Sequence, residues 1–405
     1  MVPHTRTARF PLAAICTLTA SLLITGCGSH GRYTKEHVSN AKLKMNMLKA
    51  ATEYQMAHQA FLAGDLEKAA THVDYSIGLS EKVTKSHVLK GRVLMEMGAL
   101  ERATLSFKNA EQLDPKSVEA AYYQGVLAER VARKDEALTH YQHAEEIDPT
   151  NAQYCIAAAE MMIDLGNIDQ ADTYLRERLE RFVNNAGVKQ VLGNIAMLRH
   201  DTKTAQVLFS EARLLDGEND AIIENLIRAQ IANGDYADAE VNLARMVGKK
   251  QNKGRRDLMH MRGKCLVQLD RPIEARDLFL ELTKDQSGAA DVEAWRGLGQ
   301  VAFTMRDMQR VKLCAARLIA IAPNNPDGWV LRGLMNRRAG DLLAAKMNFE
   351  QALRLKPEGE TYIMLGMVQQ DLHLPEQARA SYAQALAKDP ENTSARQLLA
   401  TVVEN

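Results

Sequence analysis

Apolar residues recur along this chain at the three- and four-residue spacing of an amphipathic helix, interrupted at regular intervals by short polar turns. Residues 118–151 show one complete unit, VEAAYYQGVLAERVARKDEALTHYQHAEEIDPTN, with an apolar helical pattern on each side of the turn at 133–136. Asp148-Pro149 ends the second pattern, because proline cannot continue a helix and disfavours a helical residue before it. Each unit is therefore predicted to be two helices joined by a tight turn.

Small residues in the unit indicate where its helices come close together. Gly125 lies inside the first predicted helix, where glycine costs about 1 kcal/mol relative to alanine, so we expect a neighbouring helix to approach its backbone. Ala137 and Ala144 are small on the second helix, and Tyr141 between them fills the remaining volume. Units of this pattern begin at residues 50, 84, 118, 152, 186, 220, 256, 292, 326 and 359.

Four positions of the unit keep their residue type in at least half of the ten copies. Position 8 is small at Ala57, Gly91, Gly125, Ala159, Gly193, Gly263, Gly299, Gly333 and Gly366, with Ile227 departing. Position 20 is alanine at Ala69, Ala103, Ala137, Ala171, Ala205, Ala239, Ala275, Ala345 and Ala378, with Val311 departing. Position 24 is aromatic at Phe107, Tyr141, Phe209, Phe279, Phe349 and Tyr382, and position 32 is proline at Pro115, Pro149, Pro323, Pro357 and Pro390. This helix-turn-helix unit resembles the tetratricopeptide repeat, and the resemblance covers residues 50–391.

The resemblance implies an all-α fold, a right-handed superhelical solenoid of about ten repeats whose first helices line a concave face. Repeats one to six occupy 50–255, repeats seven to ten occupy 256–391, and residues 392–405 are expected to form a capping helix. Between repeats six and seven the phase slips by two residues in the basic, glycine-flanked stretch 248–254. We interpret this stretch as a solvated loop between ordinary repeats, and a hinge or contact loop is the functional alternative.

The N-terminus has the form of an export signal. A weakly basic start containing Arg6 and Arg9 precedes the apolar stretch 10–24, which is too short for a comfortable membrane span. The stretch ends in Leu23-Ile24-Thr25-Gly26-Cys27, which resembles a bacterial lipobox. This resemblance implies that a lipoprotein signal, residues 1–26, is removed and that Cys27 becomes lipid-modified. A plain signal peptide or an uncleaved anchor, with Cys27 incidental, is the alternative.

The lipoprotein interpretation places the protein in the bacterial cell envelope. Residues 27–49 would then be a lipid-anchored tether and the start of the first helix, with the helical pattern beginning at Ser39. Gly28 follows the cysteine, which favours the periplasmic face of the outer membrane if the host has two membranes. The expected partners are thus the membrane, through the lipid, and other proteins.

Charge and motifs argue against several other function classes. The chain has 51 basic and 51 acidic residues, so nothing in its net charge favours nucleic acid. Cys155, Cys265 and Cys314 are too few and too widely spaced for a disulfide framework or a zinc site, and we expect them to be small buried apolar residues. His140 and His143 are close enough in sequence to share a metal but lack a third ligand. We therefore predict no enzyme, no metal, no cofactor and no small-molecule substrate.

A peptide-binding groove is what the resemblance implies instead. In tetratricopeptide proteins of the carboxylate-clamp kind, lysine, arginine and asparagine side chains on three consecutive first helices hold a peptide C-terminus. The matching positions in repeats five to seven are Gln190, Asn194, Asn225, Asp257 and Met261. The two asparagines fit the pattern, but every basic residue is missing, so a clamp of this kind is not expected.

Other first-helix positions expected to face the groove differ between the two halves of the chain. In repeats one to five they are mainly apolar: Tyr54, Phe61, Leu62, Val88, Met95, Tyr122, Val126, Ile156, Ile163, Met197 and Leu198. In repeats six to nine they are basic: Arg228, Lys264, Arg296, Arg337 and Arg338. This division suggests an apolar half for a partner helix or extended peptide and a cationic half for acidic residues. The alternative is that many of these residues pack against neighbouring repeats and the others form an ordinary solvated face.

These observations predict a non-catalytic scaffold lipoprotein that binds protein partners at the bacterial envelope. It is similar in plan to the lipoproteins of this repeat type that assist pilus and secretin assembly. An envelope scaffold for polysaccharide or cell-wall export, and a regulatory subunit of an envelope enzyme, are the alternatives.

Overall fold

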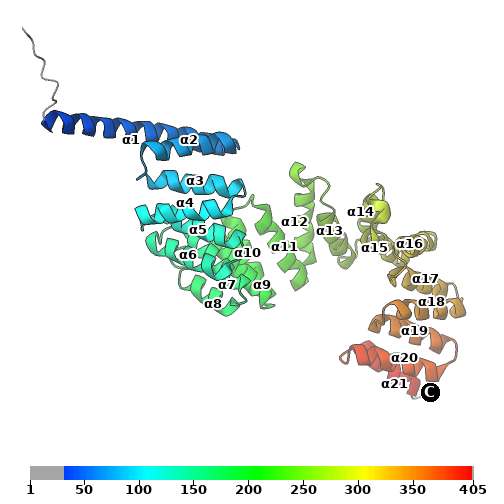
Figure 1. The fold of residues 1–405 in the computed structure, drawn as a ribbon. Helices are drawn as coiled ribbons and strands as arrows, with labels where there is room; N and C mark the ends of the chain where they lie inside the picture. The colour runs from blue at the N-terminus through cyan, green and yellow to red at the C-terminus, as the bar shows by residue number, and fades with distance from the viewer. Residues whose placement is uncertain (1–31, 404–405) are drawn as a thin grey trace, which may run out of the picture. The chain divides into compact units, whose positions relative to one another are not determined.

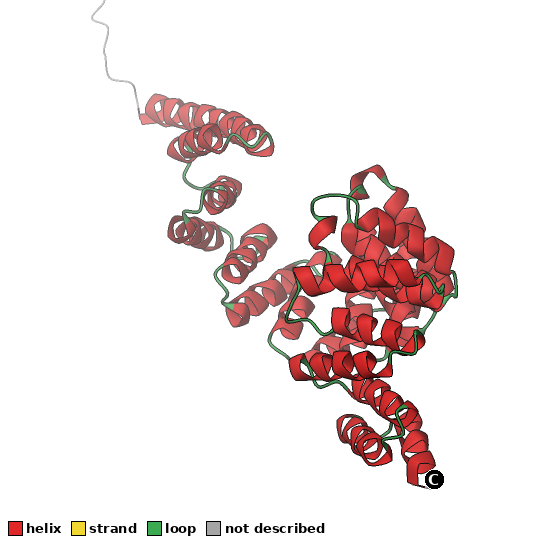
Figure 2. Cartoon of the chain, turned by 90° about the vertical axis from the view of Figure 1, so that its right-hand side faces the viewer, coloured by secondary structure: helices red, strands yellow, loops and turns green. Residues whose placement is uncertain are grey.

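The computed structural model describes residues 32–403, and these form helices joined by short loops (Figures 1 and 2). The described residues contain 21 α-helices, two short 3₁₀ helices and no strand. None of these helices combines the length and the apolar character needed to cross a bilayer. The lipobox and Cys27 lie outside the described residues.

The chain divides into two compact parts, one ending at Ala132 and the other beginning at Arg133. The first part contains α1 (Arg32–Leu62), α2 (Leu66–Leu79), α3 (Thr84–Glu96), α4 (Leu100–Leu113) and α5 (Val118–Arg130). The second part contains α6 (Lys134–Ile147), α7 (Ala152–Asp164), α8 (Ile168–Arg176), α9 (Ala186–Leu198), α10 (Thr202–Leu215), α11 (Asp220–Asn233), α12 (Tyr236–Gly248), η1 (Lys250–Asn252), α13 (Arg256–Gln268), α14 (Pro272–Leu282), η2 (Gly288–Ala290), α15 (Val292–Thr304), α16 (Met308–Ile321), α17 (Asp327–Arg338), α18 (Leu342–Leu355), α19 (Gly359–Asp371), α20 (Pro375–Lys388) and α21 (Thr393–Val403).

Consecutive helices pack against one another within each part. In the first part α1 packs on α2 and α3 packs on α4, and in the second part α9 packs on α10 and α19 on α20 (Figure 1). Each of these pairs is one of the predicted repeats, and the helix that follows packs on the second member of the pair. The predicted all-α solenoid of helix pairs is therefore confirmed. The first helix is longer than predicted, because α1 begins at Arg32 and not at Ser39.

The glycine at position 8 packs against the aromatic ring at position 24 of the same repeat. A Cβ added to Gly91 would lie 2.4 Å from the Phe107 ring, and one added to Gly193 would lie 2.6 Å from the Phe209 ring. Both rings are fully buried. The sequence predicted a close approach at this position, but a ring on the second helix makes that approach and not a helix backbone.

Two repeats use the opposite arrangement of volumes. Position 8 is Ala57 in repeat one and Ala159 in repeat four, and position 24 of these repeats is Val73 and Leu175, respectively. All four side chains are buried. Alanine at position 8 thus occurs with an aliphatic side chain at position 24, whereas glycine at position 8 leaves room for an aromatic ring at position 24. In these repeats a larger residue at position 8 thus accompanies a smaller one at position 24, as close packing of the core requires.

The turn between the two helices of every repeat contains one residue with positive φ. In five repeats it is a glycine, at Gly64, Gly98, Gly166, Gly234 and Gly340. In the other five it is Ala132, His200, Asp270, Arg306 or His373, with φ between 52° and 63°. The left-handed conformation costs a residue with a Cβ roughly 1–2 kcal/mol, so these five turns are strained.

We expect Ala132→Gly to raise the free energy of unfolding by about 0.5–1 kcal/mol, because glycine removes the steric cost at the turn but adds entropy to the unfolded chain. Urea unfolding followed by circular dichroism measures the change. Ala383→Gly, at an exposed position inside α20, is the matched control and is expected to lower stability by about 1 kcal/mol. A destabilising effect of Ala132→Gly would contradict the strain at this turn.

The loop after α12 is held in place by the first residue of α11. The Asp220 carboxylate accepts hydrogen bonds from Lys249 Nζ (2.8 Å), Gln251 Nε2 (3.2 Å) and Asn252 Nδ2 (3.0 Å). Asn252 is buried and also donates to the Met246 carbonyl oxygen. Most residues of the stretch 248–254 are exposed, and hydrogen bonds to Asp220 anchor its middle to the preceding helix pair.

Candidate functional site

The predicted groove residues of the first part lie on the first helices of three repeats, but two of these residues are buried. Tyr54 and Phe61 on α1, and Tyr122 on α5, are half-buried. Val88 and Met95 on α3 are only 3% and 5% exposed. The prediction that these two face the groove is therefore wrong.

The reason is the direction in which α3 is turned. Val88 and Met95 pack in one cluster with Ala103 and Phe107 of α4 and with α5 residues. Val126, the remaining predicted residue of α5, packs at the edge of this cluster and is half-buried. The part of α3 that stays accessible lies between these core positions.

Arg92 occupies that accessible part of α3 and is not among the groove residues predicted from the sequence. Its guanidinium carbon lies 4.7 Å from the centroid of the Phe61 ring and 4.6 Å from that of the Tyr123 ring. Tyr123 meets Tyr122 edge-on at 5.3 Å and stacks on Phe107 at 6.1 Å. An arginine between two rings is held by cation–π attraction and keeps its hydrogen-bond donors at the edge of the plane.

The signal that could have identified Arg92 is its place in the repeat. It directly follows Gly91 and so takes position 9, where the clamp pattern has an asparagine. No carboxylate among the described side chains lies within ion-pair distance of Arg92. We call Tyr54, Phe61, Arg92, Tyr122 and Tyr123 the aromatic–arginine surface.

The pKa of Tyr54 depends on both the burial and the charges of this surface. Burial raises the pKa of its hydroxyl most, the charge of Glu119 raises that pKa further, and the charge of Arg92 lowers it. Tyr54 therefore remains neutral near pH 7 and presents an uncharged hydroxyl group. Its ring also stacks on His58, with 6.1 Å between the ring centroids.

The predicted apolar and amide residues of the second part are largely engaged by their own chain. Ile156 and Ile163 are half-buried against the cluster formed by α7, α8 and α9. Asn225 Nδ2 donates to Asn194 Oδ1 at 3.2 Å, so the structure brings the two clamp-position asparagines together. Gln190 lies half-exposed on the same helix as Asn194.

The predicted basic residues mostly have carboxylate partners. Arg228 pairs with Glu224 (3.4 Å), Lys264 with Glu293 (2.5 Å), Arg296 with Glu293 (3.9 Å) and Asp327 (3.8 Å), and Arg337 with Asp371 (2.9 Å). Arg338 instead lies over the Phe303 ring at 5.4 Å. Little unbalanced positive charge is left on these first helices, which weakens the hypothesis of a cationic half for acidic residues.

The three cysteines of the repeats are free and buried, as predicted. Burial is the largest cause that raises the thiol pKa, to about 11 at Cys155 and Cys265 and to about 12 at Cys314. No group of three or more His, Cys, Asp or Glu side chains in the described part of the chain could hold a metal ion. His143 pairs with Glu146 at 3.6 Å.

We expect Cys155, Cys265 and Cys314 to resist iodoacetamide at pH 8 in the folded protein, because thiolates are the reactive form and these thiols keep their protons. Peptide mapping by mass spectrometry, with and without urea, measures the labelling of each site. Leu214→Cys, at a position 87% exposed, is the control that should react within minutes. Rapid labelling of any of the three without urea would contradict their burial.

Comparisons with known proteins concern the repeats and the fold. A family model described as "Tetratricopeptide repeat" matches residues 88–152. A tetratricopeptide repeat protein from Parabacteroides merdae aligns with 62% of this chain and 98% of its own, at 16% identity and a TM-score of 0.54. A chain of the APC/C hetero-tetramer Cut9–Hcn1 aligns with 92% of this chain and 92% of its own, at 14% identity and a TM-score of 0.44. The TPR domain of Arabidopsis OM64 aligns with 29% of this chain and 98% of its own, at 20% identity and a TM-score of 0.29. No curated protein matches the sequence.

Proposed function

We propose that this chain, a tetratricopeptide-repeat solenoid, is a non-catalytic adaptor that binds a protein partner on the aromatic–arginine surface of its first part. The fold supports protein–protein interaction in general, since the first helices of such repeats form extended binding surfaces.

The observation that carries the proposal is Arg92 between the rings of Phe61 and Tyr123. Binding hot spots are enriched in tyrosine and arginine, since these side chains combine a large apolar area with donors of fixed geometry. Arg92 is a better candidate for partner binding than the basic residues on the first helices of the second part. Most of those residues are paired with carboxylates, whereas Arg92 has no carboxylate partner. An extended peptide or helix with an acidic residue beside apolar ones would complement this surface.

Photo-crosslinking in cells tests this site. A benzoylphenylalanine in place of Tyr122 is expected to capture a defined partner, and the same group in place of Leu105, exposed on the second helix α4, is the control. Arg92→Ala is expected to abolish the capture, and Arg102→Ala on α4 should leave it unchanged. Capture that is the same at both positions, or that persists without Arg92, would reject the aromatic–arginine surface.

We further propose that the protein is lipid-anchored through Cys27 on the periplasmic face of the outer membrane of a bacterium with two membranes. The support is the apolar stretch 10–24 ending in Leu23-Ile24-Thr25-Gly26-Cys27. Incorporation of radiolabelled palmitate in cells tests the anchor, and it should disappear in Cys27→Ser. Labelling that survives this substitution would rule out Cys27 as the modified residue.

The pathway we favour is pilus or secretion-system assembly, in which an anchored adaptor would hold a partner close to the membrane. A scaffold for polysaccharide or cell-wall export and a regulatory subunit of an envelope enzyme are the other candidates. The genes beside this one distinguish them: pilin, secretin and secretion-ATPase genes support the first, and glycosyltransferase genes support the second.

A further inference from the structure

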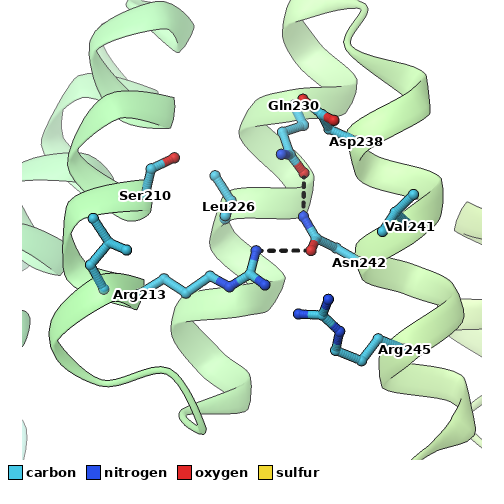
Figure 3. A pocket seen from close by; sticks show the side chains of 9 residues that line it. Ser210, Arg213, Leu226, Gln230, Asp238, Val241, Asn242 and Arg245 are labelled. Atoms are coloured by element: carbon cyan, nitrogen blue, oxygen red, sulfur yellow. Dashed lines mark hydrogen bonds between the residues drawn. The ribbon is translucent and has the colours of Figure 1, made fainter.

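A pocket of about 500 Å³ lies between the second helices of repeats five and six (Figure 3). Helices α10 and α12 both pack on α11, and side chains from all three line the pocket. It uses none of the first-helix residues that the sequence predicted for partner binding. Its volume is in the range of pockets that bind small ligands, about 300–1,000 Å³.

A chain of buried amides positions one arginine in this pocket. Gln230 Oε1 accepts a hydrogen bond from Asn242 Nδ2 (3.0 Å), and Asn242 Oδ1 accepts one from Arg213 Nη1 (2.9 Å). Gln230 and Asn242 are each only 5% exposed. Arg213 is therefore held by one of its five N–H groups, and the others remain available to a ligand.

A second arginine reaches the same place from the opposite wall. The guanidinium groups of Arg213 and Arg245 point toward one another across the pocket (Figure 3). Neither has a carboxylate within ion-pair distance among the described side chains. Two converging like charges repel one another, and an anion between them would turn that repulsion into two attractive contacts.

The charge of the lining residues indicates which anion fits. Asp238 also lines the pocket, so the two arginines and this aspartate leave one net positive charge. A carboxylate, with one negative charge, balances that charge and accepts paired hydrogen bonds from guanidinium groups. A phosphate dianion would bring excess negative charge close to Asp238. Leu214 and Val241, 87% and 55% exposed, offer apolar contacts around the charged centre.

We propose that this pocket binds the carboxylate side chain of an acidic residue flanked by apolar residues in a partner protein. The site is separate from the aromatic–arginine surface, so either can be wrong without affecting the other. It would give the adaptor a second point of attachment on the outer, second-helix side of repeats five and six.

The test uses the full chain carrying Arg92→Ala, so that binding at the aromatic–arginine surface does not contribute. The probe is a fluorescent peptide of alternating leucine and glutamate with both ends capped, so that its only carboxylates are side chains. Fluorescence anisotropy should give a dissociation constant below about 1 mM. Arg245→Ala should weaken it at least about tenfold, because a charge-assisted hydrogen-bond pair is lost. Arg354→Ala, which removes an exposed arginine without a carboxylate partner from the second helix α18, should change nothing.

A second measurement locates the site independently of the variants. The peptide should protect Arg213 and Arg245, but not Arg354, from modification by phenylglyoxal, as read by mass spectrometry. The proposal is overturned if the peptide does not bind at about 1 mM, or if a glutamine version binds equally well. It is also overturned if inorganic phosphate protects the two arginines and the peptide does not.

Discussion

Replacing Gly193 with alanine is expected to lower the free energy of unfolding by about 2 kcal/mol. The added methyl group would lie 2.6 Å from the Phe209 ring, closer than carbon atoms can approach. The ring cannot turn away, because it is fully buried among residues of α9, α10 and α11. Urea unfolding, together with hydrogen exchange of the α9 and α10 amides, measures the loss globally and within the repeat.

The same chain supplies the controls. Gly78→Ala, inside α2 with nothing within 4 Å of the added Cβ, should stabilise by up to about 1 kcal/mol. The double variant Gly193→Ala with Phe209→Leu reproduces the Ala159 and Leu175 arrangement of repeat four. It should be more stable than the sum of the two single changes predicts, by about 1–2 kcal/mol. Strict additivity would show that residues 193 and 209 do not compete for the same space.

Removing the Glu145 carboxylate is expected to destabilise the second part by about 3 kcal/mol. This carboxylate is only 6% exposed, accepts a hydrogen bond from the Tyr174 hydroxyl and pairs with Arg178 Nε at 2.5 Å. The Arg178 guanidinium also packs 3.5 Å from the centroid of the Tyr174 ring. Glu145→Ala would leave a partly buried arginine and a tyrosine hydroxyl without their partner.

This network lies at the C-terminal end of helix α8 and holds the turns that follow it. Helix α8 stops at Arg176, and the turns that follow it carry Arg178. Glu145→Ala should therefore increase hydrogen exchange most in residues 174–182, as well as lowering the urea midpoint. Glu146→Ala, one residue later and exposed, is the matched control. Equal effects of the two substitutions would mean that the network contributes nothing specific.

The network also predicts how stability depends on alkaline pH. Burial is the largest cause that raises the pKa of Tyr174, and its hydrogen bond to Glu145 raises it further. Below pH 10 the Tyr174 hydroxyl is protonated in both the folded and the unfolded chain, so its stabilising contribution to folding is fully present. Above pH 10 the unfolded chain loses the proton first, so stability falls as pH rises. Tyr174→Phe should make the loss between pH 10 and 11 smaller, as measured by urea unfolding at each pH.

The sequence predicted the helix pairs because the repeat itself carries the information. Glycine at position 8, alanine at position 20 and proline at position 32 set helix contacts and helix ends, and these depend on neighbours within the same 34 residues. The binding surface depends on how each first helix is rotated. Val88 and Met95 have the apolar character of groove residues, yet rotation places them in the core.

Arg92 and the pocket between Arg213 and Arg245 could not be predicted from the sequence, for a related reason. Arg92 gains its character from Phe61 and Tyr123, which lie about 30 residues away on each side, one repeat before and one after. Arg213 and Arg245 belong to second helices, whereas the repeat pattern predicts a binding face on the first helices. Periodicity shows which positions are equivalent between repeats, but not which side chains from different repeats meet.

The different residue sizes at positions 8 and 24 are also expected to disfavour pairing between helices of different repeats. Repeats look alike, so a first helix could pair with the second helix of the wrong repeat. In repeats four to seven such a slip would force the Ala159 methyl group or the Ile227 side chain against the Phe209 ring, because these repeats have Leu175 and Leu243 at the matching place. In repeats four to seven, neighbouring hairpins thus differ enough in shape to disfavour pairing with one another's helices, even though they follow the same pattern.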